Sequence, residues 1–203
     1  MAALALIRHG QYEQLENTPS ALQPYPLTDS GAAEVRAQAQ AFGRWLGEAG
    51  FVLQPQIHCS TLLRAWQTAE IFREELVDFF IAQPQCLSFT ALCERSVGAV
   101  ANLTVEEIER IVQQDPRLAP LPAGWKSISE FRLPFEGAES LLESGERVAA
   151  HLNTLPLSES DRSIQLVVGH GASIRHAMYH LNVIKFCDIG KLSMFYGHPV
   201  VFQ

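Results

Sequence analysis

Two apolar runs in this 203-residue chain end in the same way, with a histidine followed by a glycine. The segment at residues 5–10 reads ALIRHG, and the segment at residues 164–171 reads IQLVVGHG. Such runs are typical of strands buried in a parallel sheet, and ligands bind these sheets at the carboxyl ends of the strands. If the two strands are neighbours, His9 and His170 face one another at that edge. Arg8 beside His9 then predicts an anion site with a nucleophile or base next to it.

The rest of the chain alternates between strand and helix patterns. We expect further strands at residues 56–59 and 86–89, one or two strands within 191–195 and 199–202, and helices at 28–46, 61–80, 104–114, 140–155 and 172–181. This alternation predicts an α/β fold of three layers, in which a mostly parallel central sheet is flanked by helices. In the first helix, four residues recur at a spacing of four and predict its buried face: Ala33, Ala37, Ala41 and Trp45.

No repeat, low-complexity tract or linker divides the sequence, so we expect one domain at residues 1–203. Residues 94–136 do not fit the alternation, because one helix capped by Thr104 is followed by an irregular stretch with four prolines. We expect this segment to be a helical insertion that lies over the sheet edge as a cap. Its aromatic residues are expected to pack the insertion onto the domain rather than line a substrate pocket: Trp125, Phe131 and Phe135.

The composition is that of an ordinary soluble globular protein, with 47% hydrophobic and 18% charged residues. A formal net charge of −7 argues against nucleic acid or an anionic membrane surface as a partner. The apolar start of the chain lacks the basic region of a signal peptide, and no membrane span is expected. The four cysteines form no CxxC pair, so we expect reduced thiols in a cytoplasmic protein: Cys59, Cys86, Cys93 and Cys187.

Two further positions supply side chains that an anion site needs. Ser60 follows the strand at residues 56–59 and is expected to cap a helix that carries Arg64 about one turn inside. The amino end of such a helix also attracts phosphate through its free N–H groups. Glu94 and Arg95 lie in a later loop, where a Glu–Arg pair is ordinarily surface charge. Beside an anion pocket, Glu94 is suited to donate a proton and Arg95 to clamp the substrate.

Taken in order along nearly the whole chain, these motifs resemble the histidine phosphatase superfamily, which has the phosphoglycerate mutase-like fold. The matching segments are RHG at residues 8–10, PLTDSG at 26–31, STLLRAWQTA at 60–69, ER at 94–95, GAES at 137–140 and HGASIR at 170–175. Each segment alone is weak, but together they are specific. The resemblance implies a phosphoric monoester hydrolase that uses no metal and no cofactor.

The resemblance also implies roles for individual residues. His9 is expected to attack phosphorus and form a phosphohistidine that water then hydrolyses. Arg8, Arg64 and His170 are expected to hold the phosphoryl oxygens, while Glu94 protonates the leaving oxygen and later deprotonates the water. The two arginines should keep His9 neutral, because they disfavour its protonated form. The residues expected to bind phosphate are Arg8, Arg64, His170, Gly171, Arg95 and Gln11.

Two departures from the resemblance favour a phosphatase over a mutase. The superfamily's mutases carry a serine and an asparagine soon after the RHG motif as phosphate contacts, whereas this chain has Tyr12 and Leu15 at those places. Gln11 or Asn17 is the expected substitute. Mutases also need clustered basic residues in the insertion to hold a carboxylate and a second phosphate. The basic residues of this insertion form no cluster in the sequence: Arg95, Arg110, Arg117, Lys126 and Arg132.

Three alternatives stay open at this point. They are a phosphoglycerate mutase or bisphosphatase, a non-catalytic phosphate-binding scaffold of the same fold, and a metal-dependent hydrolase that uses His170, His176 and His180. The last two histidines have the spacing of a zinc-binding helix but lack the glutamate that follows the first histidine in such motifs. The expected partner is a small phosphorylated substrate or a phosphoprotein, and a homodimer is compatible with the sequence.

Overall fold

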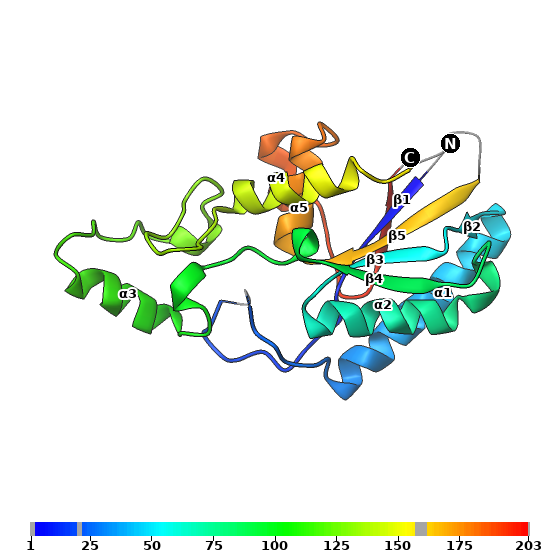
Figure 1. The fold of residues 1–203 in the computed structure, drawn as a ribbon, viewed down its shortest axis with the longest axis horizontal. Coiled ribbons are helices and arrows are strands. Elements are labelled where there is room, and N and C mark those ends of the chain that lie inside the picture. The colour runs from blue at the N-terminus through cyan, green and yellow to red at the C-terminus, as the bar shows by residue number, and fades with distance from the viewer. Residues whose placement is uncertain (1–2, 20–21, 157–161, 203) are drawn as a thin grey trace.

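The computed structural model describes residues 3–19, 22–156 and 162–202, which are built around a six-stranded sheet (Figure 1). The strands are β1 (Ala3–Arg8), β2 (Val52–Leu53), β3 (Gln56–Ser60), β4 (Gln85–Phe89), β5 (Ser163–Gly169) and β6 (Pro199–Phe202). Their order is β4-β3-β5-β1-β6, and β2 pairs separately with β5. Only β6 runs antiparallel to its neighbour, so the mostly parallel sheet that the sequence predicted is confirmed.

Helices cover both faces of the sheet and give the fold its three layers, as predicted. The α-helices are α1 (Asp29–Ala49), α2 (Leu63–Glu75), α3 (Val105–Gln114), α4 (Leu141–Leu152) and α5 (Gly171–His180). Helices α1 and α2 pack on one face, and α4 and α5 pack on the other (Figure 1). Side chains alternate along β1, because Ala5 and Ile7 point toward α1 and α2 whereas Leu6 points toward α4 and α5.

Local sequence signals determine where the helices begin and end. The Thr28 hydroxyl accepts a hydrogen bond from the N–H of Gly31 at the start of α1, and Gly50 ends this helix with a φ of 67°. Thr104 and Ser140 each form a capping box with the glutamate three residues later, at the starts of α3 and α4. Short 3-10 segments complete the fold: η1 (Val77–Phe79), η2 (Thr90–Leu92), η3 (Gly98–Val100), η4 (Trp125–Ser127) and η5 (Phe186–Lys191).

The segment at residues 94–136 extends outward beyond the carboxyl ends of the strands, and α3 forms its outer part (Figure 1). The aromatic side chain of Trp125 is 2% exposed and belongs to an apolar cluster with Ile108 and Leu133. Phe131 and Phe135 pack against the same cluster. The aromatic residues therefore have a packing role, as predicted, although the cluster that they stabilise is largely the insertion's own.

The predicted buried face of α1 was wrong. Three of its members, Ala33, Ala37 and Ala41, are exposed, and only Trp45 packs against the core. The helix instead buries a neighbouring stripe: Gly31, Val35, Ala39, Phe42, Gly43 and Leu46. Alanine misled the prediction because it is favourable on a solvent-facing helix surface as well as in a core.

Two element boundaries also differ from the prediction. Ser60 is the last residue of β3 and does not cap α2, which begins at Leu63 and ends at Glu75 rather than near Phe80. Of the two strands considered in the tail, only β6 forms. Residue 191 is the last residue of η5, and residues 192–195 are not part of a strand. Strand β1 pairs with β5 on one side, and β6 occupies its other edge, so no second tail strand can pair with β1.

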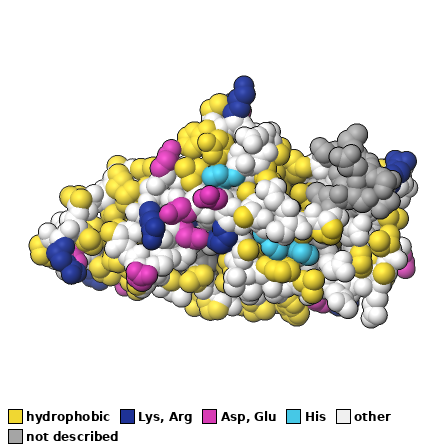
Figure 2. Space-filling model, turned by 45° about the horizontal axis from the view of Figure 1, so that its top comes forward, with side chains coloured by type: hydrophobic (Ala, Val, Ile, Leu, Met, Phe, Trp, Pro, Cys, Tyr) yellow, Lys and Arg dark blue, Asp and Glu magenta, His cyan; other side chains and the backbone are white. Residues whose placement is uncertain are grey.

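Charged side chains of both signs lie close together on the face shown in Figure 2, so that face carries no large patch of a single sign. Ion pairs at the protein surface include Arg36 with Glu75 and Lys191 with Asp188. Within the part of the chain that the structure describes, no helix has the length and apolar character needed to cross a membrane.

Candidate active site

The carboxyl ends of β1 and β5 bring two histidines together, as the sequence predicted. Arg8 pairs with Gly169 in the register of these parallel strands, so His9 and His170 are the next residues along each chain segment. The backbone N–H of His9 donates to the carbonyl oxygen of Gly169 at 3.0 Å, and the two imidazole ring centroids are 4.9 Å apart. His9 is 3% exposed and His170 is completely buried, so both rings lie in a largely dry site.

Arg64 of α2 connects the two histidines from a fully buried position. Its Nε donates to Nε2 of His9 at 3.3 Å, and a terminal nitrogen lies 3.4 Å from Nδ1 of His170. Its other terminal nitrogen donates to the carbonyl oxygen of Gln23 at 2.8 Å, and its guanidinium carbon lies 4.4 Å from the centroid of the Tyr12 ring. A planar, forked cation that is oriented in this way is suited to bind phosphoryl oxygens.

Hydrogen bonds define the tautomer of His9. Nδ1 lies 2.7 Å from the carbonyl oxygen of Gly10, which can only accept, so Nδ1 carries the proton and Nε2 carries the lone pair. Burial lowers the pKa of His9 from 6.5 to about 3, and the positive charges of Arg64 and Arg8 act in the same direction against the effect of the Gly10 carbonyl. His9 is therefore a neutral base at physiological pH, as the neighbouring arginines led us to expect.

His170 has the opposite tautomer. Because its Nδ1 accepts from Arg64, its Nε2 carries the proton and donates to Oγ of Ser60 at 2.9 Å. The Ser60 hydroxyl in turn donates to Sγ of Cys93 at 3.3 Å. Burial lowers the pKa of His170 well below its usual value, and His9 and Arg64 add to this effect. Ser60, which the sequence suggested as a helix cap, therefore orients His170 instead.

Arg8 frames the opposite side of the site from the end of β1. Its terminal nitrogen donates to the carbonyl oxygen of Met194 at 3.2 Å, and its guanidinium carbon lies 3.9 Å from the centroid of the Tyr196 ring. Gly171 permits this position, because a Cβ atom there would lie 3.1 Å from Cδ of Arg8. Gly171 is also the first residue of α5, so the helix itself does not use its N–H group.

Arg8, His9 and Gly171 lie in the wall of a pocket of about 200 Å³, which we call the small pocket. Its lining residues are Arg8, His9, Tyr12, Gln14, Glu94, Gly171, Ala172 and Arg175. Two arginines and one carboxylate face this space. The small pocket therefore combines a neutral imidazole, a carboxylate and an excess of positive charge, which suits a small anionic group.

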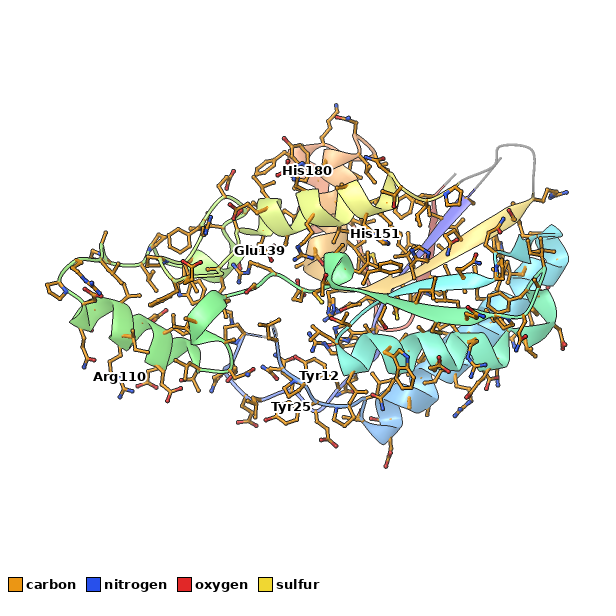
Figure 3. The ribbon with its side chains drawn as sticks, in the orientation of Figure 1. Tyr12, Tyr25, Arg110, Glu139, His151 and His180 are labelled. Carbon is orange, nitrogen blue, oxygen red and sulfur yellow. The ribbon has the colours of Figure 1, made fainter. Side chains whose placement is uncertain are left out.

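Glu94 reaches the small pocket from the loop that follows η2, and its Oε1 accepts from the backbone N–H of Arg95 at 2.9 Å. Arg147 of α4 holds the chain before Glu94, because one of its terminal nitrogens donates to three carbonyl groups of the preceding segment, those of Thr90 and Ala91 in η2 and of Cys93 after it. Arg147 also forms a bidentate pair with Glu139, at 2.9 and 2.8 Å. Figure 3 shows Glu139 close to the start of α4.

Glu139 holds the chain on the other side of Glu94. Its Oε2 accepts from the backbone N–H of Ser96 at 3.0 Å, and its own N–H donates to the Ser96 carbonyl at 2.9 Å. The arginine of the pair thus binds the residues before Glu94, and the carboxylate binds the residue two positions after it. One ion pair therefore determines the path of the loop that presents Glu94.

A larger cavity of about 580 Å³ continues from the small pocket. Gln14, Glu94, Ala172 and Arg175 line both spaces, so the two meet beside Glu94. Its remaining lining residues come mainly from the 94–136 segment and from η5, and include Arg95, Val97, Lys126, Ser127, Ser129, His176, Phe186 and Ile189. The insertion thus forms one wall of this cavity, which we call the large cavity.

Four of the six residues predicted to bind phosphate are not among those that line the small pocket: Arg64, His170, Gln11 and Arg95. Arg64 and His170 are buried in contact with His9, which does line it. Gln11 is exposed, because Gly31 packs against its backbone and its carbonyl accepts from Thr28 at 3.0 Å, which leaves the side chain facing solvent. Arg95 lines the large cavity instead. Asn17, the alternative to Gln11, is also exposed. The described side chains of this loop that do line the small pocket are those of Tyr12 and Gln14.

Sequence reasoning also missed several supporting residues. The Thr68 hydroxyl accepts from the N–H of Gly10 at 3.0 Å and donates to the carbonyl of Arg64 at 2.8 Å. Its position four residues after Arg64, on the same helix face, was a usable signal. Tyr12 and Tyr196 stack on the two arginines, and Tyr12 lies on the loop that follows β1 (Figure 3). The sequence carried no signal for Tyr196, because it lies outside every matching motif.

The histidines of α5 do not form the metal site considered as an alternative. Nδ1 of His176 donates to the carbonyl of Ala172 at 2.7 Å, and Nε2 accepts from the Ser129 hydroxyl at 3.0 Å. Nε2 of His180 donates to the carbonyl of Leu142 at 3.0 Å. These bonds occupy both ring nitrogens of His176 and Nε2 of His180. Over residues 3–19, 22–156 and 162–202, no group of three or more His, Cys, Asp or Glu side chains is arranged to hold a metal ion.

Relatives in sequence point to one family. A family model of the histidine phosphatase superfamily (branch 1) matches residues 4–200. A 2,3-bisphosphoglycerate-dependent phosphoglycerate mutase of Nitrobacter hamburgensis is 30% identical over 98% of this chain and 90% of that protein. A protein of the same name from Nautilia profundicola is also 30% identical, over 100% of this chain and 94% of its own length.

Solved structures show the same fold. A mycobacterial glucosyl-3-phosphoglycerate phosphatase superposes with a TM-score of 0.66 at 22% identity, over 98% of this chain and 88% of that chain. YhfR of Bacillus stearothermophilus superposes with a TM-score of 0.66 at 20% identity, over 100% and 91%. The phosphoglycerate mutase-like fold expected from the sequence is therefore confirmed. Since the family model covers nearly the whole chain, the protein belongs to branch 1 of the histidine phosphatase superfamily.

Proposed function

We propose that the protein hydrolyses phosphomonoesters without a metal ion, through a phosphohistidine intermediate on His9. The observation that carries this proposal is the state of His9, a buried and neutral imidazole whose proton is held by the Gly10 carbonyl at 2.7 Å. Its Nε2 lone pair is thereby oriented next to the Arg64 guanidinium. A nucleophile needs both the correct protonation state and a defined direction of attack.

In the first step, Nε2 of His9 attacks phosphorus and forms a P–N bond while the P–O bond to the leaving group breaks. The leaving oxygen takes a proton from the Glu94 carboxyl group. The imidazole becomes positively charged, and the Gly10 carbonyl stabilises this charge because it accepts the Nδ1–H bond. Arg64 exchanges its 3.3 Å bond to Nε2 for a phosphoryl oxygen, which leaves the lone pair available.

In the second step, water attacks phosphorus and the P–N bond breaks. The Glu94 carboxylate takes a proton from the water, so Glu94 and His9 return to their starting states as inorganic phosphate leaves. Arg8, Arg64, His170 and the N–H of Gly171 bind the phosphoryl oxygens and stabilise the charge that develops on them. His170 donates to these oxygens through a proton that Ser60 otherwise accepts.

Hydrolysis of an aryl phosphate by the wild type and by His9→Ala, each with and without a chelator, tests this proposal. We expect wild-type activity to persist with chelator and to disappear in His9→Ala. Quenching with alkali during turnover should also trap an acid-labile, base-stable phosphoenzyme on His9. Activity that persists in His9→Ala, or that disappears only with chelator, would contradict the proposal. A wild type that binds phosphate but hydrolyses no ester would instead favour the non-catalytic scaffold.

The mutase or bisphosphatase alternative has one observation in its favour, because the sequence relatives described above are named phosphoglycerate mutases. Incubation with 3-phosphoglycerate and a trace of 2,3-bisphosphoglycerate separates the activities. A mutase forms 2-phosphoglycerate with no net release of phosphate, whereas the proposed phosphatase releases inorganic phosphate. We expect the second result.

A further inference from the structure

The side chain of Cys93 connects two parts of the candidate active site. Its Sγ accepts a hydrogen bond from the Ser60 hydroxyl at 3.3 Å, and the Ser60 oxygen accepts from Nε2 of His170 at 2.9 Å. The same sulfur lies 3.0 Å from Oγ1 of Thr61. Glu94, the proposed proton donor, is the next residue along the chain. Cys93 therefore joins the loop that presents Glu94 to the group that orients His170.

The bond to Cys93 sets the direction of the Ser60 hydroxyl. A serine hydroxyl has one proton to donate and two positions at which its oxygen accepts. The Ser60 oxygen accepts from Nε2 of His170 and from the backbone N–H of Leu62, at 2.9 and 3.2 Å. Its single proton is donated to Sγ of Cys93. Because Ser60 is completely buried, the sulfur rather than solvent receives this proton.

This direction matters for the tautomer of His170. A serine hydroxyl donates to an unprotonated imidazole nitrogen as readily as it accepts from a protonated one. If the Ser60 hydroxyl turned toward His170, the proton of the ring would move to Nδ1. The bond to Cys93 opposes this change, because it uses the proton of Ser60 elsewhere. Arg64 also opposes a proton on Nδ1, but the same guanidinium is proposed to bind phosphoryl oxygens during the reaction.

We infer that Cys93 is a positioning residue for His170, because its sulfur takes the Ser60 proton and so keeps the imidazole proton on Nε2, from which it is donated to the phosphoryl group. This inference rests on the proposed function, since it takes His170 as a donor to the phosphoryl oxygens. Thr61 completes the chain. While the sulfur accepts from Ser60, the thiol proton is directed to Oγ1 of Thr61, which is an exposed residue.

NMR of the protein with isotopically labelled histidine tests the inference without turnover, because the chemical shift of each ring nitrogen reports whether it carries a proton. The signals of His170 are identified by their loss in His170→Gln. In the wild type, with and without inorganic phosphate, we expect the proton of His170 on Nε2. In Cys93→Ala with phosphate bound, the signals should shift toward the form that is protonated on Nδ1.

Two further variants make this measurement specific. Cys93→Ser keeps an acceptor for the Ser60 proton, so it should keep the wild-type state of His170. Cys187→Ala is the control, because Cys187 is an exposed cysteine of η5, and it should change nothing. A wild-type His170 that carries its proton on Nδ1 would overturn the inference, and this outcome can be observed even if Cys93→Ala does not fold.

A double-mutant cycle separates the positioning role from a merely structural one. Cys93→Ala should lower kcat/KM for 4-nitrophenyl phosphate by about tenfold, less than the loss of a whole donor would cost, and Cys93→Ser should keep most of the activity. If Cys93 acts through Ser60, adding Cys93→Ala to Ser60→Ala should cause no further loss. Losses that multiply in the double variant would contradict the inference.

The inference and the proposed function fail in distinguishable ways. If hydrolysis depends on His9 but Cys93→Ala leaves the proton of His170 on Nε2, the positioning role is wrong and the proposed function stands. If activity survives in His9→Ala, the proposed mechanism is rejected. A proton that moves to Nδ1 of His170 in phosphate-bound Cys93→Ala would then still support Cys93 as the residue that positions His170 toward phosphate.

Discussion

The guanidinium of Arg64 donates to Nε2 of His9 at 3.3 Å, so the atom proposed as nucleophile is already in contact with the cation proposed to bind phosphate. This contact has two effects. It favours the unprotonated form of Nε2, and it places a forked donor where the phosphoryl oxygens are expected. The same guanidinium also reaches Nδ1 of His170. Arg64 therefore organises both histidines at once.

Replacing Arg64 should reduce activity more than stability. In Arg64→Met the apolar stem is kept but the forked donor is lost, so kcat/KM for an aryl phosphate should fall by about 10²–10³, as for other donors to transition-state charge. The pKa of His9, followed by NMR, should rise because a positive neighbour is removed. Arg44→Met on the exposed side of α1 is the control and should change neither quantity. An unchanged kcat/KM in Arg64→Met would exclude its proposed role.

The depressed pKa of His9 makes stability depend on pH. Between pH 6.5 and about 3 the unfolded chain binds a proton that the folded state excludes, so this contribution to stability is complete above pH 6.5 and is lost as the pH falls. Urea unfolding should therefore show the wild type losing about 2 kcal/mol more than His9→Asn between pH 7 and pH 5, at about 1.4 kcal/mol per pH unit. Parallel stability curves for the two proteins would contradict the assigned state of His9.

Glu94→Gln should show a dependence on the leaving group. An amide cannot donate the proton that an alkoxide needs, so kcat for an alkyl phosphate should fall by about 10²–10⁴. The first step with 4-nitrophenyl phosphate, whose leaving group needs no proton, should be affected much less, as a burst of nitrophenol would show. Glu48→Gln, on the exposed surface of α1, is the matched control. If the rate of the first step falls equally for both esters, Glu94 is not the general acid.

Arg147 should be a positioning residue for Glu94. Arg147→Met removes the bidentate pair with Glu139 and the bonds to three loop carbonyls, and we expect a loss of about 2–3 kcal/mol in the free energy of unfolding. Looser placement of Glu94 should also lower kcat for an alkyl phosphate by about tenfold while KM changes little. Arg147→Lys should retain part of the free energy of unfolding and part of kcat that Arg147→Met loses.

The control for this prediction is Arg132→Met. Arg132 forms a single exposed ion pair with Glu143 at 3.3 Å, which is worth about 0–1 kcal/mol. If both arginine variants lose the same stability and activity, Arg147 has no special relation to the Glu94 loop.

Two glycines inside helices should respond oppositely to alanine. At Gly145 of α4 a Cβ atom would lie 2.4 Å from Cβ of His176 in α5, so Gly145→Ala should destabilise the protein by about 1–3 kcal/mol through overpacking. At Gly47 of α1 the nearest atom would be 3.8 Å away, so Gly47→Ala should stabilise it by about 0.5–1 kcal/mol. Urea unfolding of both variants measures this. If Gly145→Ala leaves the free energy of unfolding unchanged, α4 and α5 can move apart without destabilising the protein.

The sequence was most informative where structure follows from adjacent residues. The apolar runs predicted β1 and β5, and the capping residues Thr28 and Thr104 marked the starts of α1 and α3. It was least informative where the same residue type fits two environments. Exposed alanines on α1 imitated a buried face, and Ser60 had the composition of a helix cap although its hydroxyl binds His170.

By itself, the sequence determined the α/β class, the order of the motifs and the arrival of His9 and His170 at strand ends, because these depend on periodicity and on neighbouring residues. Only the tertiary structure decided the tautomers of both histidines, the exclusion of Gln11 from the small pocket and the placement of Arg95 and Lys126 on one cavity wall. The contact between Arg64 and His9 joins residues 55 positions apart. Such contacts depend on how whole elements pack, and no local pattern of residues predicts that these two side chains lie in contact.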